Sequence, residues 1–335
     1  MPPKNYGGIE SVAELLVDGL VDKGHDVTVF TVEDSQTKAN KLALFDFGQL
    51  SYLDAPPSPF LSTSIANVMY AYKEIENGDF DVIADHTWKD GLLCAEFIDI
   101  PVVHTLHGTS NAPHGVFFEQ LSDSKTKFVS ISEYQRSTYP MLQVDHVVYN
   151  GLDLAKYPFV ENKENFYSFL GRFCPEKGPH IACEVANKLG VPLYLAGKIN
   201  EPAERDYFDE YVKPQLSTNV EYVGEVGFYS NEKMELLSKA KGLLNPIQWD
   251  EPFGIVMAEA QACGTPVVTF DYGSTSELVK HGETGFVVNE THEFVEAAEA
   301  VEKLDAEACR RNICERFSAS AMVSAYEEIY ANAAR

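Results

Sequence analysis

Short apolar runs alternate with amphipathic helical patterns along this chain, and this alternation constrains the fold more than any other feature. An amphipathic run over residues 9–23 ends at Gly24, and strand patterns follow at 26–32, 82–84, 101–106, 128–131 and 145–148, with helical patterns between several of them. Strands that alternate with helices predict a parallel sheet with crossover helices. The first part of the chain is therefore predicted to be one α/β unit.

A second series of the same kind begins after the turn Asn150–Asp153. Strand patterns lie at 166–170, 192–196, 220–223, 242–245, 266–270 and 285–288, and helical patterns at 179–189, 203–215, 231–240, 255–262 and 274–279. A final amphipathic helix is predicted over 318–334. The expected organisation is an N-terminal Rossmann-like domain over 1–150, a second one over 151–317 and a C-terminal helix over 318–335. A chain of 335 residues is long enough for two such domains, and we expect them to face a cleft at the carboxyl ends of their strands.

The charge of the chain disfavours several classes of partner. With 26 Lys+Arg against 51 Asp+Glu, the formal net charge is −25, which repels nucleic acid and anionic membrane surfaces. Residues 1–150 carry 9 Lys+Arg and 21 Asp+Glu, so a basic membrane-binding face has no support there. The six cysteines form no metal-binding spacing, and no leader-like or membrane-spanning apolar run is present, so we expect a cytoplasmic protein without a metal site.

Two carboxylates stand eight positions apart in the segment EPFGIVMAE, from Glu251 to Glu259. The amides of Phe253, Gly254 and Ile255 lie where a helix begins, so they are free to donate to an anion or a sugar hydroxyl. Glu259, inside the helix among apolar residues, needs a donor such as a ribose hydroxyl. An equally weighted alternative is that both carboxylates are solvated, with Glu251 favoured only by the helix dipole.

The segment GRFCPEKG places two cations at a glycine-rich turn between a strand and a helix. A guanidinium at Arg172, an ammonium at Lys177 and free helix amides together suit a diphosphate. The competing interpretation is a surface ion pair, for example with Glu176.

Two further sites are weaker on their own. Gly7 and Gly8 precede a helix, where the backbone can approach a phosphate closely. His107 follows an apolar strand and is predicted to point into the cleft, although a lone histidine is more often structural. Asp85 and His86 end another strand and are weaker candidates of the same kind.

Together these motifs resemble the family 4 retaining glycosyltransferases of GT-B fold. The resemblance is specific at EPFGIVMAEAQACGTPVV and GRFCPEKG, and weaker at the GG loop, TLHG, SISEYQR and NGLD, and it covers nearly the whole chain in the right order. It implies two Rossmann-like domains, with the C-terminal helix crossing back to the first, and a nucleotide-diphosphate sugar bound against the second.

The resemblance also implies a role for each matched residue. Arg172 and Lys177 would bind the diphosphate with help from Gly7 and Gly8, and Glu259 would bind the ribose. Glu251 and the amides of 253–255 would hold the donor sugar, and His107 would lie beside the sugar and the leaving phosphate. Gly197 and Lys198 would lie near the diphosphate, and Val226, in the turn 224–226, near the base.

The chemistry implied is metal-independent transfer of a hexose with retention, by front-face attack of the acceptor hydroxyl. UDP-glucose is the expected donor, with GDP-mannose next, and no cofactor is expected. The acceptor is left open between a carbohydrate, a lipid-linked molecule and a small molecule. A sugar-nucleotide epimerase or a phosphorylase-like protein is the competing enzyme class.

The chain departs from the family pattern at its start. Family members have a hydrophobic strand before the GG loop, and only residues 1–8 precede the first helix here. We therefore expect either that the true start of the chain lies upstream or that the N-terminal domain lacks its first strand. The second case would leave two strand edges unpaired and destabilise the domain. This departure keeps open the alternative of a catalytically weak or silent nucleotide-sugar-binding protein.

Overall fold

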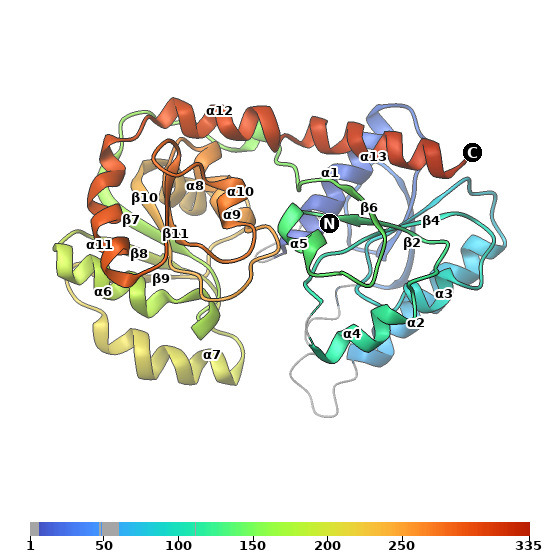
Figure 1. Ribbon diagram of the computed structural model, residues 1–335, viewed down its shortest axis with the longest axis horizontal. Helices are drawn as coiled ribbons and strands as arrows, with labels where there is room; N and C mark the ends of the chain where they lie inside the picture. The colour runs from blue at the N-terminus through green and yellow to red at the C-terminus, as the bar shows by residue number, and fades with distance from the viewer. Residues whose placement is uncertain (1–6, 47, 49–59, 111) are drawn as a thin grey trace. The chain divides into compact units, whose positions relative to one another are not determined.

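The computed structural model describes residues 7–46, 48, 60–110 and 112–335 (Figure 1). Its contacts group the chain into two compact units. The first contains Ile9–Gly151 and Ala319–Arg335, and the second contains Leu152–Ser318 together with Gly7 and Gly8. Each unit is a parallel α/β structure, as the alternation of patterns predicted.

The second unit is built on a parallel sheet in the order β12-β11-β10-β7-β8-β9. Its strands are β7 (Glu164–Leu170), β8 (Leu193–Ala196), β9 (Val220–Gly224), β10 (Ala240–Asn245), β11 (Val267–Phe270) and β12 (Gly285–Val288). The chain runs outward from β7 to β9 and then returns to the other side of β7 for β10, so the strand order reverses there. In open parallel sheets, ligands bind beside the carboxyl ends of the strands at such a reversal.

Helices accompany this sheet, and their apolar faces form its core. They are α6 (Pro179–Leu189), α7 (Pro202–Tyr207), α8 (Asn231–Lys239), α9 (Ile255–Ala262), α10 (Thr275–Leu278), α11 (Thr291–Ala300) and α12 (Ala306–Arg316). The core joins Tyr167 and Phe169 of β7 to Leu193 of β8 and Phe294 of α11, all of them buried. Burying several side chains of this size contributes about 1.5–3 kcal/mol for each.

The sequence predicts one continuous helix over 203–215, and this prediction is wrong, because only the first part of that segment is α-helical. After α7 the chain takes a π-helical turn over Phe208–Val212 and a 3-10 turn over Lys213–Gln215. Pro214 lacks an amide N–H and cannot continue the α-helical hydrogen bonding, which accounts for the change. In the first unit, helix α5 (Glu133–Ser137) is short and ends before Pro140.

The first unit contains two separate parallel sheets among its described residues. One pairs β1 (Thr28–Val32) with β2 (Asn40–Phe45), and the other has the order β3-β4-β5-β6. The strands of the second sheet are β3 (Ile83–Asp85), β4 (Val102–Thr105), β5 (Lys127–Ser130) and β6 (Val144–Val147). Residues 1–6, on which the expectation of a missing first strand depends, lie outside the described residues.

The helices of the first unit come from both the N-terminal and the C-terminal parts of the chain. They are α1 (Gly8–Asp22), α2 (Phe60–Glu76), α3 (Leu92–Ala95), α4 (Ala112–Glu119), α5 and α13 (Ala319–Ala333). A Cβ atom added at Gly19 of α1 would lie 2.6 Å from a methyl carbon of Val323 on α13, so the two helices pack closely. The hydroxyl groups of Tyr326 on α13 and Thr105 on β4 are 3.0 Å apart. None of the helices in the described ranges has the length and apolar character needed to cross a membrane.

Candidate active site

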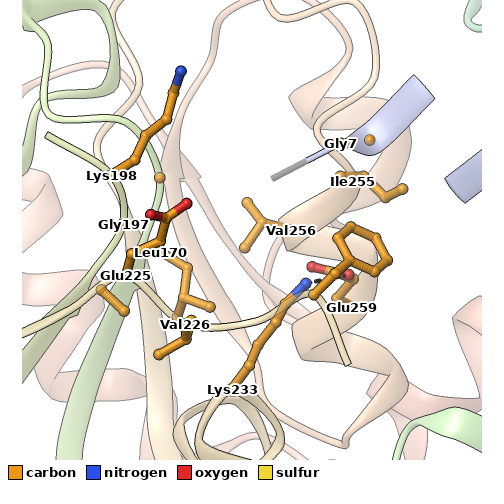
Figure 2. Close-up of a pocket in the computed structure, with 14 residues that line it drawn as sticks. Gly7, Leu170, Gly197, Lys198, Glu225, Val226, Lys233, Ile255, Val256 and Glu259 are labelled. Atoms are coloured by element: carbon orange, nitrogen blue, oxygen red, sulfur yellow. Dashed lines mark hydrogen bonds and ion pairs between the residues drawn. The ribbon is translucent and has the colours of Figure 1, made fainter. Parts of the chain in front are cut away.

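A pocket of the second unit lies at the carboxyl ends of β7, β8 and β9 (Figure 2). Strand ends, the turn after β9 and helices α8 and α9 contribute its walls. Its lining residues are Gly7, Gly8, Leu170, Gly171, Ala196, Gly197, Lys198, Glu225, Val226, Phe228, Lys233, Ile255, Val256 and Glu259. Seven of the thirteen predicted site residues are among them: Gly7, Gly8, Gly197, Lys198, Val226, Ile255 and Glu259.

Glycines allow the strand ends to meet closely at this pocket. Gly197 has a φ of 154°, and a Cβ atom there would lie 1.8 Å from the carbonyl oxygen of Gly171. The amide of Gly171 donates to Ala196, and the amide of Gly197 donates to Gly224, both at 3.1 Å. The three strands therefore stay paired up to the pocket, and Lys198 projects from the next position.

Helix α9 begins at the pocket because Gly254 takes a left-handed conformation, with a φ of 83°. Ile255 and Val256, in its first turn, line the pocket, and their amides precede any intrahelical partner. Phe253 is 2% exposed, and its ring packs edge-on against Phe317. The side chain of Phe253 is thus part of the core, so the role implied for this residue concerns its backbone amide.

Lys177 and Glu251, which the family resemblance assigns to different parts of the ligand, form an ion pair with each other. Their charged atoms are 2.5 Å apart, and the side chains are 17% and 12% exposed. The indole N–H of Trp249 also donates to Glu251, at 3.1 Å. The sequence allowed an ion pair for Lys177 with Glu176, and the structure places Glu251 there instead.

Arg172 lies at the turn after β7, with its guanidinium 3.9 Å from the buried carboxylate of Glu204. Neither Arg172 nor Lys177, Glu251, Phe253 or Gly254 lines the pocket defined above. They belong to the two loops beside it, after β7 and before α9.

Glu259 is held by two donors that the sequence patterns did not reveal. The ammonium of Lys233 on α8 and the hydroxyl of Tyr157 reach its Oε1 atom at 2.7 and 2.8 Å. Glu259 is 1% exposed and Lys233 7%. The need of this carboxylate for a donor was predictable from its apolar neighbours in the sequence, but the identity of the donors was not, because they come from segments 26 and 102 residues away.

His107 belongs to the first unit and does not line the pocket. Its Nε2 atom is 3.1 Å from Nδ1 of His86, while the buried His104 is 2.8 Å from Asp85. The weaker candidates Asp85 and His86 thus share a histidine cluster with His107. Burial lowers the pKa of His86 to about 4, and burial with the neighbouring histidines lowers that of His107 well below its usual value.

The lowered pKa of His86 predicts a loss of stability in acid. Below pH 6.5 the unfolded chain binds a proton at this residue that the folded chain does not bind until about pH 4. We expect this histidine to remove at most about 3 kcal/mol from the unfolding free energy as the pH falls from 6.5 to 4. Urea unfolding of the wild type and of His86→Gln across this range measures it, and parallel pH profiles for the two proteins would contradict it.

Within the described ranges, no three His, Cys, Asp or Glu side chains are grouped as metal ligands.

The architecture and the pocket define a class: a two-unit parallel α/β protein with a ligand pocket at the strand ends of its second unit. Two family models match this chain, Glycosyltransferase Family 4 over residues 6–156 and Glycosyl transferases group 1 over residues 155–321. Together they span both units, and the chain belongs to the glycosyltransferases, with the GT-B architecture.

Individual relatives are distant. The chain is 30% identical over 235 residues to glycogen synthase of Mycobacterium tuberculosis, a match that covers 61% of this chain and 55% of that protein. It is thus aligned with little more than half the length of that relative. It is 26% identical to D-inositol 3-phosphate glycosyltransferase of Rhodococcus erythropolis, covering 85% of this chain and 75% of the relative.

Solved structures resemble the whole chain. The glycosyltransferase AviGT4, involved in avilamycin A biosynthesis, has a TM-score of 0.73 and 25% identity, with 99% of this chain and 92% of that chain covered. HepE of Anabaena, in complex with UDP and glucose, has a TM-score of 0.74 and 21% identity, with 99% and 96% covered.

Proposed function

We propose that the protein transfers a hexose from a nucleotide-diphosphate sugar to an acceptor hydroxyl, with retention of the anomeric configuration and without a metal ion. One observation carries this proposal above the others. The pocket of the second unit combines helix N-terminal amides at Ile255 and Val256 with a buried, anchored carboxylate at Glu259. That combination suits a ligand with an anionic part and a hydroxyl-bearing part.

The electrostatics of the chain support an anionic ligand at this place. The net charge of −25 repels anions in general, so a bound anion needs local donors. Lys198 lines the pocket, and Arg172 and Lys177 lie on the loop after β7 beside it. In this proposal these cations and the glycine amides at 7 and 8 bind the diphosphate, Glu259 binds the ribose, and Val226 contacts the base.

The reaction then depends on stabilising the departing diphosphate. The bond between the anomeric carbon and the β-phosphate oxygen breaks, and negative charge grows on that phosphate. The acceptor oxygen bonds to the anomeric carbon from the same face, and its proton passes to the leaving phosphate. Lys177, already paired with Glu251, would link the phosphate to the carboxylate that holds the sugar hydroxyls. The assignment of His107 to the donor sugar stays a prediction.

UDP-glucose is the proposed donor, with GDP-mannose next. The relative HepE, whose structure contains UDP and glucose, supports the first choice by analogy of fold. The acceptor class is a carbohydrate, a lipid-linked molecule or a small molecule, and nucleic acid is disfavoured by the charge.

A second candidate, a nucleotide-sugar-binding protein with weak or no turnover, rests on a specific observation. In the described part of the first unit, β1 and β3 each have one paired neighbour and belong to different sheets. A strand edge without a partner leaves backbone N–H and C=O groups unpaired, which costs free energy wherever the edge is buried. This candidate predicts donor binding without transfer.

A thermal-shift screen of nucleotide sugars, followed by a donor-consumption assay with and without EDTA, separates the two candidates. A ligand that binds only the native state raises the unfolding temperature. We expect one UDP- or GDP-sugar to raise it and to be consumed in the presence of EDTA. A shift without consumption favours the binding protein, and no shift with any donor contradicts both.

A further inference from the structure

Lys233 lines the pocket, but its ammonium group is paired with a carboxylate of the protein itself. Its ammonium is 2.7 Å from Oε1 of Glu259 and 4.1 Å from the centre of the Phe228 ring, and its side chain is 8% exposed. A lysine held in this way has little reach toward a diphosphate. Its position therefore needs an explanation other than anion binding.

The second donor to Glu259 comes from a different element. Tyr157 follows a 3-10 turn over Leu154–Lys156, is 2% exposed and donates its hydroxyl to the same Oε1 atom. Two donors from two segments fix the carboxylate of Glu259 in one orientation. In the part of the chain that the structure describes, no donor reaches Oε2, and Glu259 lines the pocket.

We propose that Lys233 and Tyr157 are positioning residues that hold Glu259 with Oε2 directed to the ligand, and that this arrangement makes the pocket select ribonucleotides over 2′-deoxyribonucleotides. The inference rests on the proposed function, because it takes Glu259 as the acceptor for the ribose hydroxyls. Figure 2 shows Lys233 and Glu259 side by side, with Val226, Ile255 and Val256 around them.

Stability alone does not explain the pair. A buried ion pair gains little over a well-packed apolar pair of the same volume, because removing two charges from water is costly. Lys233 and Glu259 lie in an otherwise largely apolar wall formed by Leu170, Val226, Phe228, Ile255 and Val256. An anchored carboxylate in such a wall makes sense if the ligand offers hydroxyl donors to it.

An anchored acceptor also gives specificity. A site built to accept hydrogen bonds from a substrate hydroxyl disfavours an analogue without it, because the buried acceptor is then left unpaired. A mobile carboxylate can turn to the remaining 3′-hydroxyl and loses less. Removing an anchor should therefore weaken the binding of the ribonucleotide more than the binding of the 2′-deoxyribonucleotide. The ratio of the two affinities then falls.

The test is calorimetric titration of UDP and GDP and of their 2′-deoxy counterparts. We expect the wild type to bind its preferred ribonucleotide at least about tenfold more tightly than the deoxy form. Lys233→Met should lower this ratio to about threefold or less, and Tyr157→Phe should lower it in part. The matched control is Lys239→Met on the same helix, whose partner Glu235 is at 3.4 Å on the surface, and it should keep the wild-type ratio.

Each outcome decides the inference. A folded Lys233→Met that keeps the wild-type ratio overturns it. If Lys233→Met does not fold, as circular dichroism would show, Tyr157→Phe decides in its place, and an unchanged ratio in that variant overturns the inference. A wild type that binds both forms equally overturns the inference and leaves the proposed function standing. A wild type that binds no nucleotide overturns the proposed function and the inference with it.

Discussion

Replacing Arg172 or Lys177 by alanine is expected to lower donor turnover by roughly tenfold to a thousandfold. Each cation is assigned to the diphosphate, where charge grows as the anomeric bond breaks, and the loss of one such donor has effects of this size. Lys177 has a second role, because its ammonium is the partner of Glu251 at 2.5 Å. The measurement is kcat in the donor-consumption assay with the donor found by the screen.

A surface lysine of the same unit provides the control for these variants. Lys213 pairs with Asp209 at 2.7 Å, and both side chains are more than 60% exposed. Lys213→Ala should therefore turn over donor at the wild-type rate, because an exposed pair contributes little. Wild-type turnover by both Arg172→Ala and Lys177→Ala would exclude these cations from the diphosphate site.

Glu259→Leu is expected to destabilise the second unit by about 3–5 kcal/mol. The substitution leaves the ammonium of Lys233 buried without its counter-charge, and breaking one half of a buried pair has a cost of this size. The hydroxyl of Tyr157 loses its acceptor at the same time. Urea unfolding followed by circular dichroism measures the change in free energy.

The double variant Lys233→Met/Glu259→Leu should recover most of this stability. Removing both charges leaves an apolar pair in place of the ion pair, which is often neutral for stability. What remains is the unpaired Tyr157 hydroxyl, at about 1–3 kcal/mol. A free energy of unfolding for Glu259→Leu within about 1 kcal/mol of the wild-type value would contradict this prediction. It would show that Lys233 pairs with another group or with water when Glu259 is removed.

The sequence was sufficient for the sheet of the second unit, because each of its strands is a short apolar run between helical patterns. It was less informative where secondary structure depends on tertiary contacts. The strand β2, none of whose positions is fully buried, and the helices α11 and α12 were not predicted. The irregular turns over 208–215 follow from Pro214, which the helical periodicity around it concealed.

The candidate site was predictable at its glycines and helix start, since these follow from local chemistry. Gly197 and Gly254 both take left-handed or extended conformations that only glycine tolerates at such close approach. Pairings between distant segments were not predictable. Lys177 with Glu251, Lys233 with Glu259 and His86 with His107 depend on the fold, and no spacing in the sequence encodes them.

The most direct test of the central claim is amide hydrogen exchange with and without saturating UDP-glucose or, if the screen selects it, GDP-mannose. If the nucleotide sugar binds in the pocket of the second unit, protection should increase over residues 171–178, 197–198, 224–228 and 253–259, where the amides and side chains assigned to it lie. The strands over 28–45 of the first unit should exchange as before. Unchanged exchange in all four segments, under conditions where the donor is bound or consumed, would contradict the account.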